Sequence, residues 1–497
     1  MKRIVKNIIV LLALCSSVGL TSCLDLDPVI YDKISPDNFF QTEDDAKAAV
    51  TAIYNPFRPD WGGSIYSAGM GTYLTLNNLP SDDTGLTRSD WEIPDRFLWN
   101  STTDWVTGLY NPLLKYVSRA TQLMYYLDKS PIREEIKAHY IAEVQCARAQ
   151  YMFILYDLYG SGGVVLDPEI LLNPEEDVYL ERPSQSDFAK LIETDLLAAS
   201  KNLPETYGVT DWGRFTKGAA LTILQKLYMQ EKNWEAAKKV GREIITLGYN
   251  LQDSYKSIFT VENEMNDEII WAVPCKAEGG SGNMWMTHVL CPDYPVKNSN
   301  IQRWYVYITP WDFYEKYEDG DDRKTLNVSE FYYIPAGASE PVLATRENFI
   351  HLQYGALPLK YPEDPNQTAE MAGNDMVIYR YADVLLAQAE VLNELNGPSA
   401  EAIALVEQVR SRAHLVNSIP TSATASKDAF RDFILDERGR ELFVEGHRRR
   451  DLIRHGKFIE VAHKQGHEAA KDFMVLFPIP QNAIDDSKGM VKQNPGY

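Results

Sequence analysis

The chain has 497 residues, 45% of them hydrophobic, and a formal net charge of −21. This length is enough for a large hydrophobic core or for two domains. The acidity argues against nucleic-acid binding, which requires a basic face, and otherwise indicates only solubility.

The N-terminus has the pattern of a signal peptide. Three basic residues within the first six positions precede a short apolar run at 8–14, which is too short to span a bilayer comfortably. The sequence LTSC, ending at Cys23, resembles a lipobox. On this interpretation residues 1–22 are a lipoprotein signal peptide and Cys23 is lipidated. The alternative is an ordinary secretory signal that happens to contain a cysteine.

Removal of residues 1–22 would take away three positive and no negative charges, so the mature chain would carry −24. Each buried CH₂ of an acyl chain contributes about 0.8 kcal/mol to membrane binding, so several chains would anchor the protein firmly. No later segment is apolar enough to span a membrane. We therefore expect a soluble body that contacts the membrane through its lipid anchor only.

An extended tether after Cys23 leads into the first predicted helix of the mature chain. The apolar positions between residues 35 and 54 recur at helical spacing. Residues 57–106 hold no period for long and are rich in Gly, Asn, Asp and Ser, which predicts surface loops. Further helices are predicted at 107–128 and 132–159.

Pairs of helices follow. A helix is predicted at 186–203, and 218–247 reads as two helices with a tight turn at Lys232-Asn233. The offsets of four, nine and seven between Leu224, Tyr228, Ala237 and Ile244 are similar to those of a tetratricopeptide repeat, in which small and large residues let two antiparallel helices pack closely. A second such pair is predicted at 377–395 and 399–413.

Residues 249–376 are mixed and loop-rich, and EIIWAVP at 268–274 is the best strand candidate. Cys146 lies in a predicted helix and is expected to be a small buried hydrophobe. Cys275 and Cys291 could form a disulfide in an oxidising compartment, but sequence does not give their separation in space.

The segment 430–458 carries the most specific pattern in the chain. Its apolar residues recur at helical spacing, and the acidic and basic residues between them could form i,i+3 and i,i+4 ion pairs. On composition alone this is an amphipathic helix with its charges on the solvated side. We instead predict that five of these residues are structural and pair with one another and with Arg448, Arg450 or Arg454. The five are Glu437, Arg438, Glu441, Glu445 and Asp451.

The order of these residues resembles the C-terminal signature of the SusD/RagB family of nutrient-binding outer-membrane lipoproteins. The matching residues are Glu437-Arg438, Glu441-Leu442, Glu445-Gly446, Arg450-Asp451-Leu452 and Arg454. Arg450 stands where the family usually has Trp or Phe. Further blocks that resemble the family are 212–220, 380–394, 409–413, 477–480 and 493–497.

The resemblance implies a mainly α fold: a single globule of tetratricopeptide-like helix pairs with a loop-rich ligand face and little β structure. It divides the mature chain into an N-terminal region at 23–260 and a C-terminal region at 261–497. It also implies a role at the cell outer membrane, facing outside. There the protein would capture oligosaccharides, or in some members peptides, and pass them to a SusC-type TonB-dependent transporter.

No catalytic motif accompanies this pattern. GxSxG, P-loop and HExxH motifs are missing from the sequence, and no cofactor is expected. His463 and His467 could share a helix face, but Gly466 lies between them and no third metal ligand is evident. A surface glycoside hydrolase, which needs two carboxyl groups roughly 5–10 Å apart, remains the alternative from another class.

A glycan binder needs aromatic rings to stack on sugars and polar groups to bind hydroxyls. Any single tryptophan in a loop could instead fill a local core. We expect the ligand face to form from the loops at 61–105 and 285–311, which hold Trp61, Trp91, Trp99, Trp105, Trp285, Trp304 and Trp311. Our predicted ligand-binding residues are Asp82, Asp83, Trp91, Trp99, Asn100, Trp285, Trp304 and Tyr305.

The lipobox interpretation makes a direct prediction. Cys23→Ala should release the protein from the membrane fraction or leave it unprocessed, because no acyl chain can be attached. Membrane fractionation with immunodetection measures this. A variant that fractionates like the wild type would contradict the assignment of Cys23.

Overall fold

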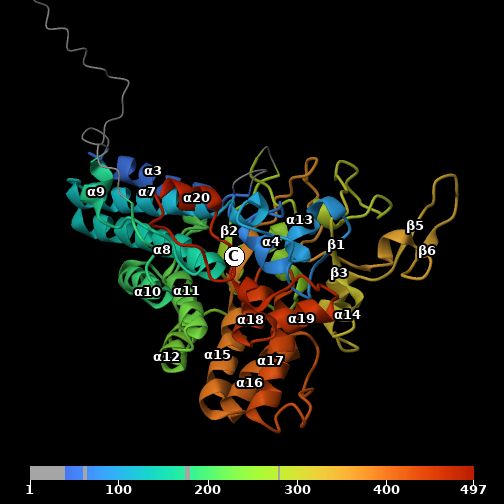
Figure 1. Cartoon of the computed structure of the whole chain (residues 1–497). Coiled ribbons are helices and arrows are strands. Elements are labelled where there is room, and N and C mark those ends of the chain that lie inside the picture. Colours follow the sequence, from blue (N-terminus) through green and yellow to red (C-terminus); the bar gives the residue numbers. More distant parts are fainter. Residues whose placement is uncertain (1–39, 60–63, 174–178, 278–279) are drawn as a thin grey trace, which may run out of the picture.

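The structure is a computed structural model and describes residues 40–59, 64–173, 179–277 and 280–497. The predicted signal peptide, Cys23 and Trp61 lie outside the described residues. Helices fill the left side and the bottom of the view in Figure 1, and loops with short strands fill the right side. The fold is mainly α, as the sequence predicts.

The helices form one continuous array in which each packs on the next. α8 packs on α7 and α10, α11 on α10 and α12, and α12 on α15, which in turn contacts α16 and α17. The array crosses the boundary between 23–260 and 261–497 at the contact of α12 with α15. Its helices are α3 (Glu43–Ala52), α7 (Tyr110–Lys129), α8 (Glu134–Tyr159), α10 (Gln185–Asn202), α11 (Lys217–Gln230), α12 (Trp234–Ile245), α15 (Tyr381–Asn396), α16 (Ala400–Arg412) and α17 (Lys427–Leu442).

Local sequence explains the two helix pairs. Leu224, Ala237 and Ile244 are fully buried between α11 and its neighbours. A Cβ on Gly241 would lie 2.2 Å from the terminal amide atoms of both Gln225 and Gln388, so a larger residue would force these side chains to move where α12 approaches α11 and α15. The predicted pairs at 218–247 and 377–413 are thus present, joined at Lys232-Asn233 and around Gly397.

Shorter helices carry the loops and the C-terminal segment. They are α4 (Tyr73–Asn78), α5 (Glu92–Asp95), α6 (Asp104–Thr107), α9 (Pro168–Leu172), α13 (Trp285–Val289), α14 (Trp311–Tyr314), α18 (Arg448–Arg454), α19 (Phe458–Lys464) and α20 (Gln481–Asp486).

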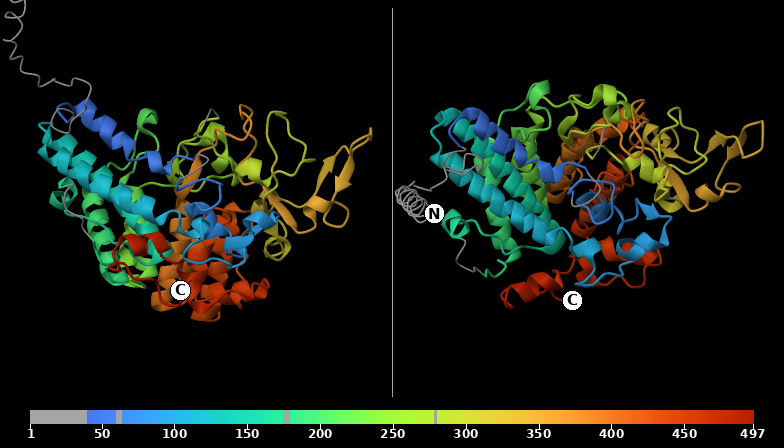
Figure 2. Two further views of the ribbon diagram at one scale, coloured as in Figure 1. Left: turned by 45° about the horizontal axis from the view of Figure 1, so that its top comes forward. Right: turned by 90° about the horizontal axis from the view of Figure 1, so that it is seen from above.

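The strands are short and antiparallel. One sheet has the order β1-β3-β7-β4, and β2–β8 and β5–β6 form two-stranded ribbons. The hairpin β5–β6 projects from the end of the molecule opposite the helical array in both views of Figure 2. The strands are β1 (Gly85–Leu86), β2 (Ile269–Val273), β3 (Tyr307–Pro310), β4 (Asn327–Val328), β5 (Phe331–Tyr333), β6 (Val342–Ala344), β7 (Gly355–Pro358) and β8 (Met376–Arg380).

The strand predicted at 268–274 is confirmed as β2, but the helix predicted from Val377 begins four residues later. Residues 376–380 form β8, which pairs with β2 and is buried along its whole length. Val377, Ile378 and Tyr379 are β-branched or aromatic and fit a buried strand. The helical period of α15 continues only by coincidence into these residues.

The three described cysteines are free thiols, all buried. Cys146 lies inside α8, as predicted. The disulfide considered between Cys275 and Cys291 is not formed in the structure. Burial raises the pKa of the Cys275 thiol well above its ordinary value.

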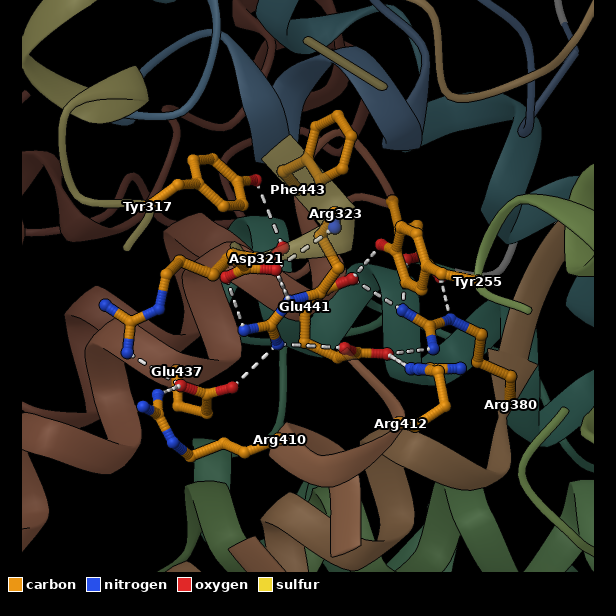
Figure 3. Close-up of polar contacts among 12 residues, drawn as sticks. Tyr255, Tyr317, Asp321, Arg323, Arg380, Arg410, Arg412, Glu437, Glu441 and Phe443 are labelled. Atoms are coloured by element: carbon orange, nitrogen blue, oxygen red, sulfur yellow. Dashed lines mark hydrogen bonds and ion pairs between the residues drawn. The ribbon is translucent and has the colours of Figure 1, made fainter. Parts of the chain in front are cut away.

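The charged residues of α17 are buried in an ion-pair network, shown in Figure 3. Glu437 binds Arg323 at 2.6 Å, and Arg410 and Arg440 at 2.7 Å each. Glu441 binds Arg323 at 3.0 Å, Arg380 at 2.5 Å, and Arg412. The network therefore joins α17 to α16, to the end of β8 and to the turn that carries Arg323.

Two further buried groups extend this network. Glu445 binds Arg380 at 2.7 Å and also Lys360. Arg438 binds Asp383 of α15 and Asp451 of α18, at 2.8 Å each. These charges do not lie on a solvated face, because their partners come from elements that cover the helix on several sides.

Electrostatics keeps the carboxyl group of Glu441 ionised. Burial alone would raise the pKa of Glu441, but the guanidinium groups of Arg412, Arg380 and Arg323 outweigh it and hold the pKa well below its ordinary value. Of the basic partners predicted nearby, Arg454 does pair with Asp451, at 2.8 Å. Most partners come instead from distant segments.

Arg438→Ala should therefore lower the melting temperature. The change leaves Asp383 and Asp451 buried with one partner fewer, and removing one partner of a buried ion pair costs roughly 3–5 kcal/mol of unfolding free energy. Thermal denaturation followed by circular dichroism measures the effect. Arg242→Ala is the control, because its pair with Glu401 is more than half exposed and should contribute at most ~1 kcal/mol. Equal melting temperatures for the two variants would contradict a structural role for Arg438.

Candidate ligand-binding face

The fold brings the two predicted ligand loops together. β1 pairs with β3, with Gly85 opposite Ile308 and Leu86 opposite Tyr307. The backbone N–H of Thr87 continues this contact by donating to the carbonyl oxygen of Val306 at 2.9 Å. Residues 85–91 and 304–310, more than 200 positions apart, therefore lie side by side.

An aromatic ridge runs across this junction; we define it as Trp105, Trp91, His288 and Trp304. The ring centroids of Trp91 lie 5.8 Å from those of both Trp105 and His288, and His288 lies 4.8 Å from Trp304. The three indoles are half-buried, and Trp91 and Trp304 pack against the core. The ridge thus has a rigid inner side and a partly open outer side.

His288 is the buried spacer of the ridge. Its Nδ1 lies 2.8 Å from the carbonyl oxygen of Met284, and its ring stacks on Tyr307. Burial lowers the pKa of His288 to about 4, so the imidazole is neutral at physiological pH. The neutral ring of His288 packs between the indoles of Trp91 and Trp304 and sets their spacing.

Exposed polar side chains border the ridge. Arg88 pairs with Asp90 through Nε–Oδ1 at 3.0 Å and Nη2–Oδ2 at 2.7 Å, and its guanidinium lies 5.7 Å from the ring centroid of Trp91. The indole N–H of Trp304 donates to Oε1 of Gln302 at 2.9 Å. Donors and acceptors therefore stand beside aromatic faces, which is the combination that sugar hydroxyls and C–H faces require.

Tyr305 lies next to the ridge and is half-buried. Its ring contacts His351 edge to face, with centroids 4.7 Å apart, and its hydroxyl donates to the carbonyl oxygen of His351. The hydroxyl is thus already partnered, and the ring is what Tyr305 can offer to a ligand. Tyr354, close by in sequence to His351, is 70% exposed.

Two tryptophans predicted to stack on a ligand are core residues. Trp285 is 1% exposed, stacks on Tyr307 and donates its indole N–H to the carbonyl oxygen of Pro358 at 2.9 Å. Trp99 is 5% exposed, packs on Phe477 and donates to the hydroxyl of Tyr497 at 2.7 Å. With rings covered and N–H groups satisfied, neither is presented to a ligand, and both predictions are corrected.

The Ser81-Asp82-Asp83 turn is also internal. Asp82 binds Arg448 at 2.6 and 2.9 Å and Lys316 at 2.8 Å. Asp83 accepts from the hydroxyls of Ser81 and Thr84, at 2.9 Å each. The predicted role as acceptors for sugar hydroxyls is corrected, because protein donors occupy both carboxylates.

The two neighbouring carboxyl groups differ in pKa. Burial would raise the pKa of Asp82, but Arg448 and Lys316 outweigh it and hold the pKa below its ordinary value. Burial and the charge of Asp82 raise the pKa of Asp83 to about 6. One carboxylate thus serves as the ion-pair partner, and its neighbour accepts hydrogen bonds from the backbone of Val444 and from hydroxyls.

Asn100 is exposed, but it belongs to a local turn. Its Oδ1 accepts from the backbone N–H of Thr102 at 2.9 Å, and the adjacent Ser101 accepts from the N–H of Gln481 at the start of α20. The ligand-binding prediction for Asn100 stays a prediction. Trp311 forms a separate contact, donating its N–H to the carbonyl oxygen of Leu352 at 2.9 Å.

Sequence reasoning missed part of the ridge. Trp105 and His288 are ridge members, and Arg88 and Gln302 border it. Arg88 and Gln302 stand two to three residues from predicted stacking tryptophans, which is the local signal that could have found them. His288 has no such signal, because only the fold brings it between Trp91 and Trp304.

The described residues offer neither a metal centre nor a membrane span. No group of three or more His, Cys, Asp or Glu side chains among them is arranged to hold a metal ion. His463 contacts the carbonyl oxygen of Ala470 at 2.9 Å instead. Among the helices in the same part of the chain, none combines the length and apolarity needed to cross a bilayer.

Most of the chain is similar in sequence to proteins of a known family. A sequence profile described as the SusD family matches residues 234–497, and one described as "Starch-binding associating with outer membrane" matches residues 74–229. "SusD-like protein P25" of Formosa agariphila is 28% identical, with 92% of this chain and 91% of that protein covered.

Solved structures agree with these matches at the level of the fold. A "Laminarin binding SusD-like protein" has a TM-score of 0.75 at 24% identity, covering 92% of this chain and all of that one. "Surface glycan-binding protein A" of Bacteroides thetaiotaomicron, in complex with laminarihexaose, has a TM-score of 0.71 at 22% identity. It covers 91% of this chain and 99% of that one.

A substitution of Asp82 can distinguish a structural role from a ligand-binding role for this residue. Asp82→Asn should lower the melting temperature, because it removes a buried partner of Arg448, at a cost of roughly 3–5 kcal/mol. Binding of ligand to the folded fraction should be unchanged. Asp432→Asn is the control and should leave the melting temperature almost unchanged, because the side chain of Asp432 is 55% exposed and that of its partner Lys457 is 34% exposed. Loss of ligand binding at an unchanged melting temperature would restore Asp82 to the ligand site.

Proposed function

The chain belongs to the SusD family, and from that premise we propose that it is a glycan-binding lipoprotein of the outer membrane. In this proposal the protein captures oligosaccharides on the aromatic ridge and passes them to a SusC-type TonB-dependent transporter. Cys23 carries the lipid anchor, and the ligand face points outward from the cell. The anchor and the transporter are inferred from the N-terminal pattern and from the family.

The observation that carries the proposal is the aromatic ridge itself. Trp91 and Trp304 come from loops far apart in sequence, yet His288 joins them into one partly open surface. Sugar rings stack their C–H faces on such indoles, while their hydroxyls bind neighbouring charged and amide groups. Arg88, Asp90 and Gln302 supply those groups at the edges of the rings.

The rigidity of the ridge favours binding. Trp91 and Trp304 pack against the core, so little side-chain freedom is lost when a ligand stacks on them. A bound sugar therefore retains more of its contact free energy than it would on mobile loops.

The named relatives support glycans as the ligand class. One structural neighbour is described as binding laminarin, another holds laminarihexaose, and one matching profile is described as starch-binding. These relatives are binding proteins. A peptide ligand and glycoside hydrolysis remain the alternatives to be tested.

Trp91→Ala and Trp304→Ala should each weaken oligosaccharide binding several-fold. Loss of one stacked ring costs at least ~1 kcal/mol of binding free energy, and neither change breaks a core contact as deep as those of Trp285. Isothermal titration with a panel of neutral glycans that includes laminarihexaose and maltohexaose measures the affinity.

The control is Trp234→Ala, which removes a half-buried tryptophan from α12, in the helical array. Circular dichroism checks each fold, and chromatography of the incubated glycans checks for cleavage. If both ridge variants bind normally, the ridge is not the site. If peptides bind in place of glycans, or cleaved products appear, one of the alternatives replaces the proposal.

A further inference from the structure

A cleft opens beside α13, the helix that carries His288 of the aromatic ridge. Its volume is about 800 Å³, which lies within the range of about 300–1,000 Å³ usual for small-ligand sites. It is lined mainly by residues 294–299, 325–328 and 359–365. Met286 of α13 faces this cleft, whereas His288 of the same helix belongs to the ridge.

The cleft has a positive lining on an acidic protein. Lys256 and Lys297 both line it and are exposed, and neither side chain has an ion-pair or hydrogen-bond partner in the part of the chain that the structure describes. Among the described residues of the lining, Glu363 is the one acidic residue. Its carboxylate accepts from the backbone N–H groups of Lys297 and Asn298, at 3.1 and 2.6 Å. Two ammonium groups therefore remain available to a ligand.

The walls of the cleft are held in place. The side chain of Asn298 donates to the carbonyl oxygens of Pro365 and Gln367, at 3.3 and 2.9 Å, which fixes the 294–299 loop to the opposite wall. Tyr294 packs edge to face on Phe331, with centroids 5.0 Å apart. Val328 and Leu359 contribute an apolar surface beside the lysines. A rigid site with an apolar wall and two exposed lysines in its lining is suited to an anionic sugar.

We propose that this cleft binds an acidic sugar residue, one whose carboxylate or sulfate group is held by Lys256 and Lys297. A lysine ammonium group binds such an anion as a point charge. The hydrogen bonds that it donates to the anion are stronger than those between neutral groups, because both partners are charged. The whole chain, at −21, is acidic and repels anions, so the lysines of the cleft have to provide the attraction. The inference rests on the proposed function and narrows its ligands to glycans with acidic residues.

The test titrates the full-length mature protein with two anionic probes and one neutral probe. The anionic probes are a hexameric oligogalacturonide and a sulfated galactose oligosaccharide of the same length, which separate carboxylate from sulfate. The neutral probe is laminarihexaose. The double variant Lys256→Gln with Lys297→Gln should bind an anionic probe at least tenfold more weakly and laminarihexaose equally well. Binding of the anionic probe to the wild type should also weaken as NaCl rises from 50 to 500 mM.

The matched control is Lys201→Gln with Lys239→Gln, which removes two exposed lysines from α10 and α12, away from the cleft. It should leave all affinities unchanged. If the wild type binds laminarihexaose but neither anionic probe, the cleft proposal is wrong and the proposed function stands. An equal loss in both double variants would also overturn the proposal, since it would show a general charge effect. If an anionic probe binds through the lysines while ridge variants bind every probe normally, the cleft stands and the ridge assignment fails.

Discussion

The buried contacts of Glu441 tie α17 to three elements that come from other parts of the sequence. Its carboxylate binds three guanidinium groups, from the end of β8, from α16 and from the turn at Arg323. Burying so many charges is favourable only when every one of them is paired and hydrogen-bonded. The backbone oxygen of Glu441 is used as well, by Tyr255 and Arg380. The arrangement thus fixes one relative placement of helices and strands, because any other would leave buried charges without partners.

This constraint reaches the ligand face through the 78–84 turn. Asp82 is bound by Arg448, and Asn78 exchanges hydrogen bonds with Val444 and Gly446. The next residues of the chain, Gly85 and Leu86, form β1 and pair with β3. The ridge therefore stands on a segment that the C-terminal part of the chain holds in position. What looked like a recognition turn is the link between scaffold and binding surface.

The sequence predicts the parts of this fold that repeat. The helical spacing of the apolar residues predicts α8 and the α11–α12 pair. β2 is predicted by a different signal, a short apolar run bounded by turns. In the irregular regions the apolar residues have no regular spacing, so the sequence does not show which side chains are exposed. That is why Trp91 and Trp285 look alike in sequence but differ in the structure, where one borders solvent and the other stacks on Tyr307. The partners of Glu437 and Glu441 could not be predicted either, because Arg323 and Arg380 lie far away in sequence.

The neutral imidazole at the centre of the ridge makes the ridge indifferent to protons. With a pKa of about 4, His288 gains no charge between about pH 5 and 8. Its exposed neighbours are equally constant, since the hydrogen bond from Arg88 lowers the pKa of Asp90 and that pairing raises the pKa of Arg88. His288, Arg88 and Asp90 therefore each keep one charge state over this range, and none of the three groups makes ligand binding depend on pH.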